Sequence, residues 1–402
     1  MKSVKTIVYI TRDAERANSI EENENYVIVS NKKGEALLDT YDLLKTERVE
    51  KIMEENKDAA ILVFQNTSRI EKYCAEKKWK LLNPSAELSK KMEEKISQYE
   101  WLGELQKYLP ATEIKKVSEI KLGKNKIVVQ FNHAHTGHGT FIVSDEKILS
   151  ELKQKFPERP ARVADFIDGP VFTLNIVVAE NGIFPANINY QITGLTDFTD
   201  LPFSTIGNDW KLPLTILSEK ERKEIEEMAR ALGARAKDAG WLGLFGIDVI
   251  LDEKSRKIYL LEINARQPAG TTCESMLQKS AGKNTTTFEA HMKALLGEKV
   301  SDIQKITNGA QIILRIHASQ QQNGFLRNAS ALTPRNTESA GSVLENHSAV
   351  ASLIKEGFTV TEYENTKHNA EILRIRSEKG IMESHGKLNS VGEKISSLIF
   401  NK

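Results

Sequence analysis

The sequence predicts a mixed α/β and α+β protein of two or three domains, and three observations support this fold class. The chain has 402 residues, whereas a domain usually has about 100 to 200. Strand-like runs alternate with helical stretches over residues 1–90, as in a parallel, doubly wound sheet. From 126 to 178, strand-like runs are separated by Gly and Pro, which favours a small antiparallel sheet inserted between larger units.

The elements follow from residue type and spacing. In the first part we expect strands at 6–10, 26–30, 60–64 and 81–83 and helices at 47–55 and 70–78, the latter with a capping box from Ser68 to Glu71. A longer helix is expected at 86–109, before Pro110. A further helix is expected at 219–239, between a Ser218–Glu221 capping box and Gly240. The later expected strands are 127–131, 141–143, 162–167, 171–178 and 310–316.

The composition excludes several classes of protein. Lys and Arg number 56 against 55 Asp and Glu, so no global field draws the chain to nucleic acid or to an anionic membrane. The apolar runs, such as 59–64, are too short to cross a bilayer. Cys74 and Cys273 are the two cysteines, which predicts no disulfide framework and a reducing, cytoplasmic setting.

Two acidic residues mark the strongest candidate site. Residues 245–252 and 258–266 read as a hairpin, and pairing Asp252 with Ile258 puts Asp248 opposite Glu262. Asn264 lies on the same face as Glu262, because side chains repeat with period two. Facing carboxylates repel unless a cation lies between them, and this oxygen set suits Mg²⁺. The alternative is a solvated sheet face on which these acids pair with arginines.

A glycine-rich stretch at 130–140 is the second candidate. Gly137 and Gly139 would let backbone amides approach a phosphate, with help from the hydroxyls of Thr136 and Thr140; an ordinary glycine hairpin is the alternative. Zinc binding by the nearby histidines is a less favoured reading than hydrogen bonding: His133, His135 and His138. A separate polar set fits a solvated loop, with a substrate-lining role as the alternative: Asn187, Asn189, Gln191, Asn208 and Asp209.

The segment Glu262-Ile-Asn-Ala-Arg266, with Asp248, the glycine-rich hairpin at 136–140 and the segment 164–169, resembles the ATP-grasp superfamily, in its carboxylate-amine ligase and biotin-carboxylase-like branch. The resemblance implies an ATP-grasp fold with a Rossmann-like N-terminal domain at 1–90. It also implies a nucleotide-binding domain at 91–300, with an inserted small subdomain at about 117–195, and a smaller C-terminal closing domain at 301–402.

The resemblance also implies ATP between two subdomains, with site residues in three groups. Mg²⁺ would be held by Asp248, Glu262 and Asn264, and the catalytic residues would be Arg266 and Arg315. The nucleotide would be bound by Lys95, Gln130, Thr136, Gly137, His138, Gly139, Thr140, Asp165, Phe166 and Ile167. Two positions depart from the family pattern, because Gln130 stands where relatives carry a second phosphate-binding lysine and Val171 where many carry a ribose-binding glutamate.

The function implied is an ATP-dependent carboxylate-amine ligase that forms an amide or peptide bond through an acyl phosphate. One alternative is a biotin-carboxylase-like enzyme that activates bicarbonate. In such enzymes a glutamate that acts as a base toward bicarbonate follows this segment, whereas Gln267, Pro268 and Ala269 follow Arg266 here. The other is a catalytically inactive, nucleotide-binding regulatory protein. The expected partners are a small carboxylate and an amine, with no nucleic acid and no membrane, and a homodimer is left open.

Overall fold

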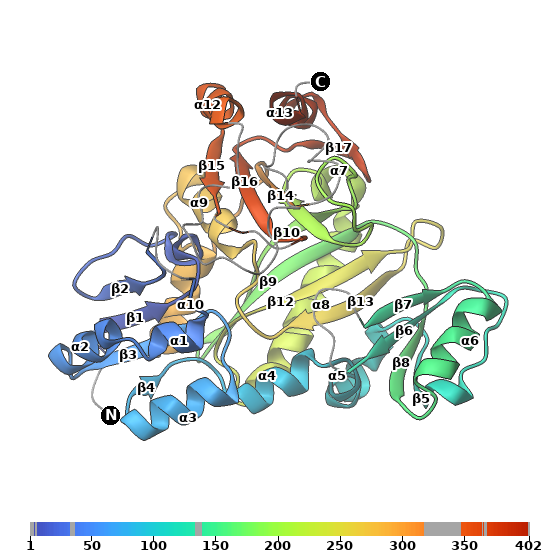
Figure 1. Cartoon of the computed structure of the whole chain (residues 1–402), viewed down its shortest axis with the longest axis horizontal. Coiled ribbons are helices and arrows are strands. Elements are labelled where there is room, and N and C mark those ends of the chain that lie inside the picture. Colours follow the sequence, from blue (N-terminus) through green and yellow to red (C-terminus); the bar gives the residue numbers. More distant parts are fainter. Residues whose placement is uncertain are drawn as a thin grey trace, which may run out of the picture.

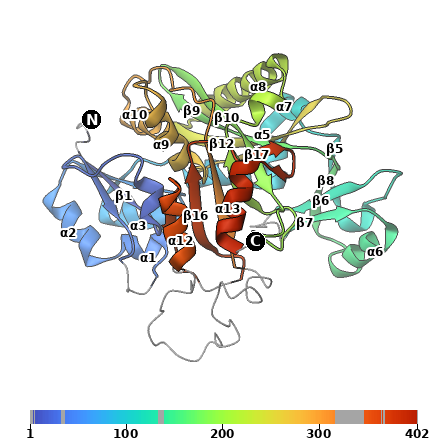
Figure 2. The ribbon, with the colours of Figure 1, turned by 90° about the horizontal axis from the view of Figure 1, so that it is seen from above.

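The computed structural model describes residues 4, 6–32, 37–132, 139–316, 347–363, 365 and 368–400. The described strands form three sheets of four, four and eight strands and a two-stranded ribbon. The N-terminal sheet and the sheet around β6 lie at opposite ends of the molecule, with the eight-stranded sheet between them (Figures 1 and 2). Within the described residues, no helix has the length and apolar character needed to cross a membrane.

The N-terminal unit is a parallel sheet in the order β2-β1-β3-β4, which confirms the predicted alternation. β1 and β3 are buried along their whole length, as expected for a sheet covered on both faces. Helices α1 to α3 cover one face, and Phe288 and Met292 of α10 cover the other. The elements are β1 (Thr6–Ile10), β2 (Tyr26–Val29), β3 (Ala59–Val63), β4 (Lys80–Leu81), α1 (Thr40–Leu44), α2 (Glu47–Glu55), α3 (Ser68–Lys77) and α10 (Thr287–Leu296).

The predicted capping box of α3 is wrong. The helix begins at Ser68, two residues before the expected start at 70, so Thr67 is the cap, and its hydroxyl accepts from the Ile70 N–H at 3.3 Å. The Glu71 carboxylate accepts instead from the Ala86 N–H at 2.7 Å. Glu71 therefore ties α3 to the start of α4 (Ala86–Glu93).

The single helix expected at 86–109 is also wrong. The chain forms α4, then α5 (Lys95–Leu102) and a 3₁₀ helix (Gly103–Tyr108), with Glu94 in an extended conformation between the first two. Tertiary bonds replace helical ones at the break: the Ile96 N–H donates to Asn132 Oδ1, and the Met92 carbonyl accepts from Gln98 Nε2, both at 2.9 Å. The break makes Lys95 the first residue of a new helix.

The sheet at the other end is antiparallel, in the order β5-β8-β6-β7. Leu149 and Leu152 of α6 pack against it. Strand β9, although it lies within the 117–195 expected for the inserted subdomain, pairs with β10 and β12 of the large sheet, because almost every residue in it is buried. The inserted sheet is thus confined to β5 (Thr112–Lys116), β6 (Ile127–Phe131), β7 (Thr140–Val143) and β8 (Pro160–Asp165), with α6 (Glu146–Lys155).

The large sheet is antiparallel, in the order β13-β12-β9-β10-β11-β14-β16-β15. Helix α8 packs its apolar stripe on one face and begins with the predicted Ser218–Glu221 capping box. β14 to β16 lie beyond residue 301, so the C-terminal segment extends this sheet. The strands are β9 (Val171–Ala179), β10 (Gly182–Thr193), β11 (Thr205–Asp209), β12 (Gly243–Leu251), β13 (Ile258–Asn264), β14 (Ala310–Arg315), β15 (Thr359–Glu362) and β16 (Glu371–Ser377).

The remaining elements surround this sheet. α7 precedes α8, α9 follows β13, and α12 and α13 lie beside each other over the C-terminal strands (Figures 1 and 2). A short ribbon of β17 and β18 precedes the last helix. Their bounds are α7 (Pro213–Ile216), α8 (Glu219–Asp238), α9 (Thr271–Ala281), α12 (His347–Lys355), β17 (Met382–Ser384), β18 (Lys387–Leu388) and α13 (Ser390–Phe400).

Candidate active site

Asp248 and Glu262 face each other across β12 and β13, as the hairpin pattern predicts. The assumed turn register is wrong by one residue, because Leu251 rather than Asp252 lies opposite Ile258. An irregularity at Leu261 corrects the register before Glu262 is reached.

Hydrogen bonds hold the Asp248 carboxylate in place. Its Oδ1 accepts from the Thr173 hydroxyl at 2.6 Å, and its Oδ2 accepts from Asn264 Nδ2 at 2.9 Å. Asp248 is 7% exposed, whereas the Glu262 side chain is 38% exposed. The structure therefore brings together the three residues expected to hold the metal.

The two carboxylates differ in their ionisation. Burial, followed by the charge of Glu262, raises the pKa of Asp248 to about 7. The Lys95 ammonium, which forms an ion pair with Glu262 Oε2, lowers the pKa of that carboxyl. Lys95 thus supplies one positive charge to this pair of facing carboxylates.

This donor set fits Mg²⁺. Two carboxylates and the Asn264 amide oxygen are hard oxygen ligands, and Mg²⁺ usually takes one or two carboxylates with water and phosphate oxygens. Within the described part of the chain, no group of three or more His, Cys, Asp or Glu could hold a metal ion. A cation at Asp248 and Glu262 would therefore also depend on the amide and on oxygens from outside the protein.

The structure does not bring the two predicted catalytic arginines together. Arg266 donates to Asn264 Oδ1 at 2.7 Å and lies 3.7 Å from a Glu93 carboxylate oxygen, next to the metal set. Arg315 lies on β14, which three strands separate from β12, or roughly 19 Å at about 4.8 Å per strand. Its guanidinium donates to the carbonyls of Thr205 and Asn369, so it anchors the chain there.

Only part of the predicted nucleotide-binding stretch falls within the described residues. Gln130 and Thr140 pair across β6 and β7, and Gln130 Nε2 donates to the Thr140 hydroxyl at 3.2 Å. The Gly139 carbonyl accepts from the Phe131 N–H at 2.9 Å. Lying outside the described residues are His133, His135, Thr136, Gly137 and His138.

Asp165, Phe166 and Ile167, expected to contact adenine, lie at the end of β8 and just after it. The N–H of Asp165 donates to the Ala111 carbonyl at 3.0 Å, and that of Phe166 donates to the Lys126 carbonyl at 3.1 Å. Main-chain contacts to a base would therefore have to use carbonyl groups or the N–H of Ile167.

Arg162 is a candidate that the sequence analysis missed. It lies opposite Gln130 in the inserted sheet and is 4% exposed. Its Nε and Nη2 both donate to Gln130 Oε1, at 3.0 and 2.6 Å, and Nη2 also donates to the Leu261 carbonyl at 3.0 Å. This last bond joins the inserted sheet to the strand that carries Glu262. An arginine inside a strand of small and apolar residues was the only signal for it.

The polar set expected to form a solvated loop lies instead on strands β10 and β11, and most of its members are buried. Directly paired residues share a face, and three members of the set, Asn189, Gln191 and Asn208, continue the row that starts at the carboxylates, on the face opposite α8. Asp209 pairs with Tyr190 and lies on the other face. Across the sheet, the row runs through Glu262, Asp248, Thr173 and Asn189. Two residues further along β10 it continues through Gln191, Asn208, Gln311 and Arg376. Buried amides thus line the sheet from the acidic pair to the C-terminal strands.

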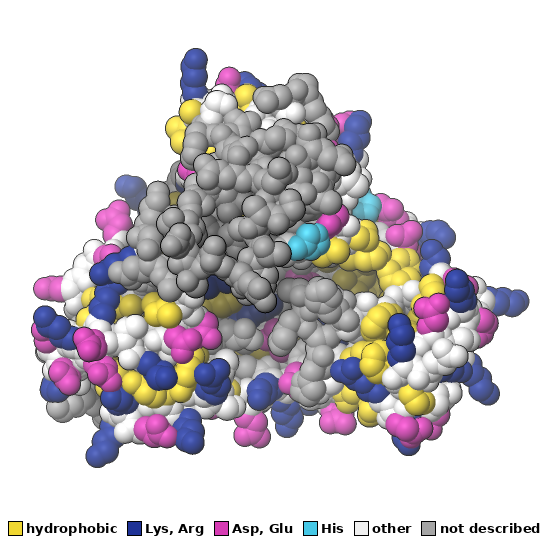
Figure 3. Space-filling view, viewed as in Figure 1, with side chains coloured by type: hydrophobic (Ala, Val, Ile, Leu, Met, Phe, Trp, Pro, Cys, Tyr) yellow, Lys and Arg dark blue, Asp and Glu magenta, His cyan; other side chains and the backbone are white. Residues whose placement is uncertain are grey.

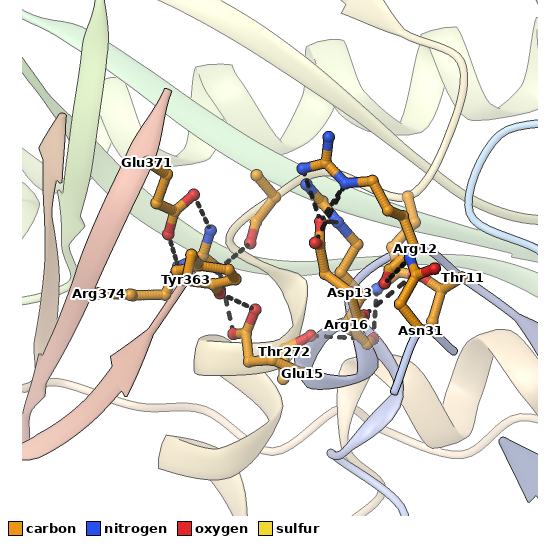
Figure 4. A network of polar contacts seen from close by, with 12 residues as sticks. Thr11, Arg12, Asp13, Glu15, Arg16, Asn31, Thr272, Tyr363, Glu371 and Arg374 are labelled. Atoms are coloured by element: carbon orange, nitrogen blue, oxygen red, sulfur yellow. Dashed lines mark hydrogen bonds and ion pairs between the residues drawn. The ribbon is translucent and has the colours of Figure 1, made fainter. Parts of the chain in front are cut away.

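A partly buried network joins the N-terminal unit to the C-terminal strands (Figure 4). The Arg374 guanidinium donates to carboxylates of Glu371 and Glu15, at 2.7 and 3.1 Å, and the Tyr363 hydroxyl donates to Glu15 at 2.8 Å. Next to Arg266, the Gln267 side chain accepts from the Tyr9 hydroxyl at 2.6 Å and donates to the Arg16 carbonyl at 3.0 Å. The N-terminal unit is therefore bonded both to the C-terminal strands and to the residue that follows Arg266.

Comparison with known proteins agrees with this architecture. Residues 92–270 match the family model of the ATP-grasp domain. No curated protein sequence matches the chain.

The solved structures that resemble it include two with matched length. N5-carboxyaminoimidazole synthetase from Staphylococcus aureus is 12% identical with a TM-score of 0.65, covering 99% of this chain and 98% of that one. The N5-carboxyaminoimidazole synthase from Aspergillus clavatus, in complex with ADP and 5-aminoimidazole ribonucleotide, is 12% identical with a TM-score of 0.65, and the match covers 100% of both chains. Biotin carboxylase from Campylobacter jejuni is 15% identical with a TM-score of 0.58, and the match covers 93% of this chain and 87% of that one. At these identities the likeness shows a shared fold.

Proposed function

We propose that the protein is an ATP- and Mg²⁺-dependent ligase that joins a small carboxylate to an amine, because residues 92–270 match the family model of the ATP-grasp domain. The observation that carries the proposal is the facing pair Asp248 and Glu262, with Lys95 bound to Glu262, where the inserted sheet meets the large sheet. Lys95 supplies one positive charge to the two carboxylates, and the Mg²⁺ of a bound nucleotide would supply the rest. The two solved synthases of matched length support the fold in which this site lies.

In the proposed reaction the γ-phosphoryl group passes to the substrate carboxylate, giving ADP and an acyl phosphate. The amine then attacks the carbonyl carbon, phosphate leaves, and the amine proton is released to solvent. Asp248, Glu262 and Asn264 would hold Mg²⁺, which neutralises charge on the phosphates. Lys95, which forms an ion pair with Glu262, and Arg266, beside Asn264, would stabilise the transferring group, which is how proteins mainly assist phosphoryl transfer.

The second candidate is activation of bicarbonate. It is favoured by the names of the similar structures, which describe carboxylated products or a carboxylase. Glu274, the nearest acidic residue after Arg266, argues against it as a base. Glu274 is fully buried, and its carboxylate accepts from Asn175 Nδ2 and from the N–H of Asn187. General-base assistance, typically worth about 10² to 10⁴-fold, would need another group.

The test measures ADP and phosphate release from ATP with a panel of amines and small carboxylic acids, and then with bicarbonate, with and without free biotin. We expect turnover that requires both an acid and an amine. Bicarbonate-dependent turnover without any amine requirement would overturn the ligase proposal. ATP binding without turnover on any substrate would favour a regulatory nucleotide-binding protein.

We further propose that the protein works in the cytoplasm on small molecules, without nucleic acid. Cys74 and Cys273 are free and buried, and burial raises the pKa of their thiols to about 11 and about 12. Basic and acidic side chains intermix on the face in Figure 3, as expected for a protein that does not bind a polyanion there. Light scattering of the purified protein would test the homodimer that the sequence leaves open.

A further inference from the structure

Arg162 carries a buried positive charge that forms no hydrogen bond to a carboxylate in the described part of the chain. Its four side-chain hydrogen bonds go to neutral oxygens, those of Gln98, Gln130 and the Leu261 main chain. Burial lowers its pKa to about 10, although the Glu262 carboxylate acts in the opposite direction, so Arg162 stays charged at neutral pH. A buried charge usually costs stability unless an opposite charge compensates it, and at functional sites that charge can come from a ligand.

Gln130 is occupied by holding this guanidinium. Its Oε1 accepts two bonds from Arg162, and its Nε2 donates to the Thr140 hydroxyl. Gln98 Oε1 accepts from Arg162 Nη1 at 2.9 Å and comes from the helix that begins with Lys95. The two cations are therefore held at adjacent residues of β13, Arg162 at the main chain of Leu261 and Lys95 at the Glu262 carboxylate.

Each of the two other cations at the site has a carboxylate beside it. Lys95 is offset by Glu262, and Arg266 lies beside Glu93, which leaves Arg162 without a bonded counterion among the described residues. Five N–H groups are present on an arginine, and four are used by these contacts. A fixed charge with one N–H to spare suits an anionic ligand that binds between the two sheets.

We propose that Arg162 supplies the fixed positive charge for the polyphosphate of the bound nucleotide, and that Gln130 positions Arg162 instead of binding phosphate itself. This inference depends on the proposed nucleotide-dependent function. It assigns the role to a residue of β8, on the strand next to the one where the sequence resemblance placed it.

The test compares Arg162→Lys with Arg162→Gln, since both lose the guanidinium fork but only the first keeps the charge. Titration calorimetry measures ATP with Mg²⁺ and, separately, adenosine, which lacks phosphates. We expect Arg162→Lys to bind ATP within about threefold of wild type and Arg162→Gln to bind it about tenfold or more weakly, with adenosine affinity equal in all three. Equal ATP affinities of the two variants, or a parallel loss of adenosine binding, would overturn the proposal.

Gln130→Glu provides a measurement that does not depend on how well the Arg162 variants fold. The new carboxylate keeps both acceptor contacts and neutralises Arg162, so we expect an unfolding temperature at or above that of wild type and weaker ATP binding. Gln154→Glu, at an exposed position of α6, is the charge-matched control and should leave ATP affinity unchanged. Unchanged ATP affinity in Gln130→Glu would contradict the role of Arg162. Failure of the wild type to bind ATP with Mg²⁺ would instead refute the proposed function on which this inference depends.

Discussion

Replacement of Lys95 by methionine tests the electrostatics of the acidic pair most sharply. Methionine keeps a similar length but removes the charge that neutralises Glu262 opposite Asp248. Breaking a fully buried ion pair costs about 3–5 kcal/mol, while exposed pairs contribute about 0–1 kcal/mol. The Lys95 side chain is 14% exposed and that of Glu262 38%, so we expect an intermediate loss of about 1–3 kcal/mol in the free energy of unfolding at pH 8.

The loss should depend on pH because Asp248 titrates near neutrality. Burial raises the pKa of Asp248 to about 7, so at about pH 5 it takes up a proton and the repulsion from Glu262 disappears. Lys95→Met should therefore destabilise the protein less at pH 5 than at pH 8.

The measurement is urea unfolding in EDTA at both pH values, with Lys91→Met as the control for loss of an exposed lysine from α4. The control should change stability by less than about 0.5 kcal/mol. Equal losses in the two variants, or a Lys95→Met loss that is the same at both pH values, would refute the reasoning.

Two further predictions concern the sheet that carries the site. A folded-state pKa that is raised means that stability falls as pH rises through it, so wild-type stability without metal should fall from about pH 4 to about pH 7. Asp248→Asn should flatten that part of the profile and unfold at higher urea concentration than wild type at pH 8; an unchanged pH profile would contradict the raised pKa. Gly207→Ala should lower the free energy of unfolding by about 2 kcal/mol or more, because the added Cβ would lie 2.2 Å from the Gln311 carbonyl oxygen. Gly123→Ala should not lower it in this way, because no atom lies within 4 Å of the added Cβ. Calorimetric unfolding of both alanine variants tests this, and equal stabilities would show that the backbone at Gly207 can move aside.

The sequence predicted the fold class and the central pair because both depend on simple periodicity. Alternating strands and helices indicated the N-terminal parallel sheet, and period two placed Asp248 opposite Glu262. The match of residues 92–270 to the ATP-grasp domain confirms the resemblance carried by these residues. The assumed turn register failed because the irregularity at Leu261 has no signal in residue type.

Other features could not be predicted because long-range partners decide them. The helix break at Glu94 has no Pro or Gly and depends on Asn132 and Gln98. Asn189 was read as part of a solvated loop because a polar side chain usually lies in water, but here it accepts from Asn208 in a buried row. Arg162 was missed for the same reason, since arginine is rarely buried without a charged partner.

The central claim is that Asp248 and Glu262 form a cation-dependent nucleotide site, and calorimetric titration of ATP with Mg²⁺ and with EDTA tests it most directly. We expect measurable ATP binding only with Mg²⁺, and in Glu262→Gln at least about tenfold weaker binding, because one carboxylate ligand and half of the acidic pair are lost. Equal ATP affinity with and without Mg²⁺, or a Glu262→Gln variant that binds as wild type does, would contradict the account.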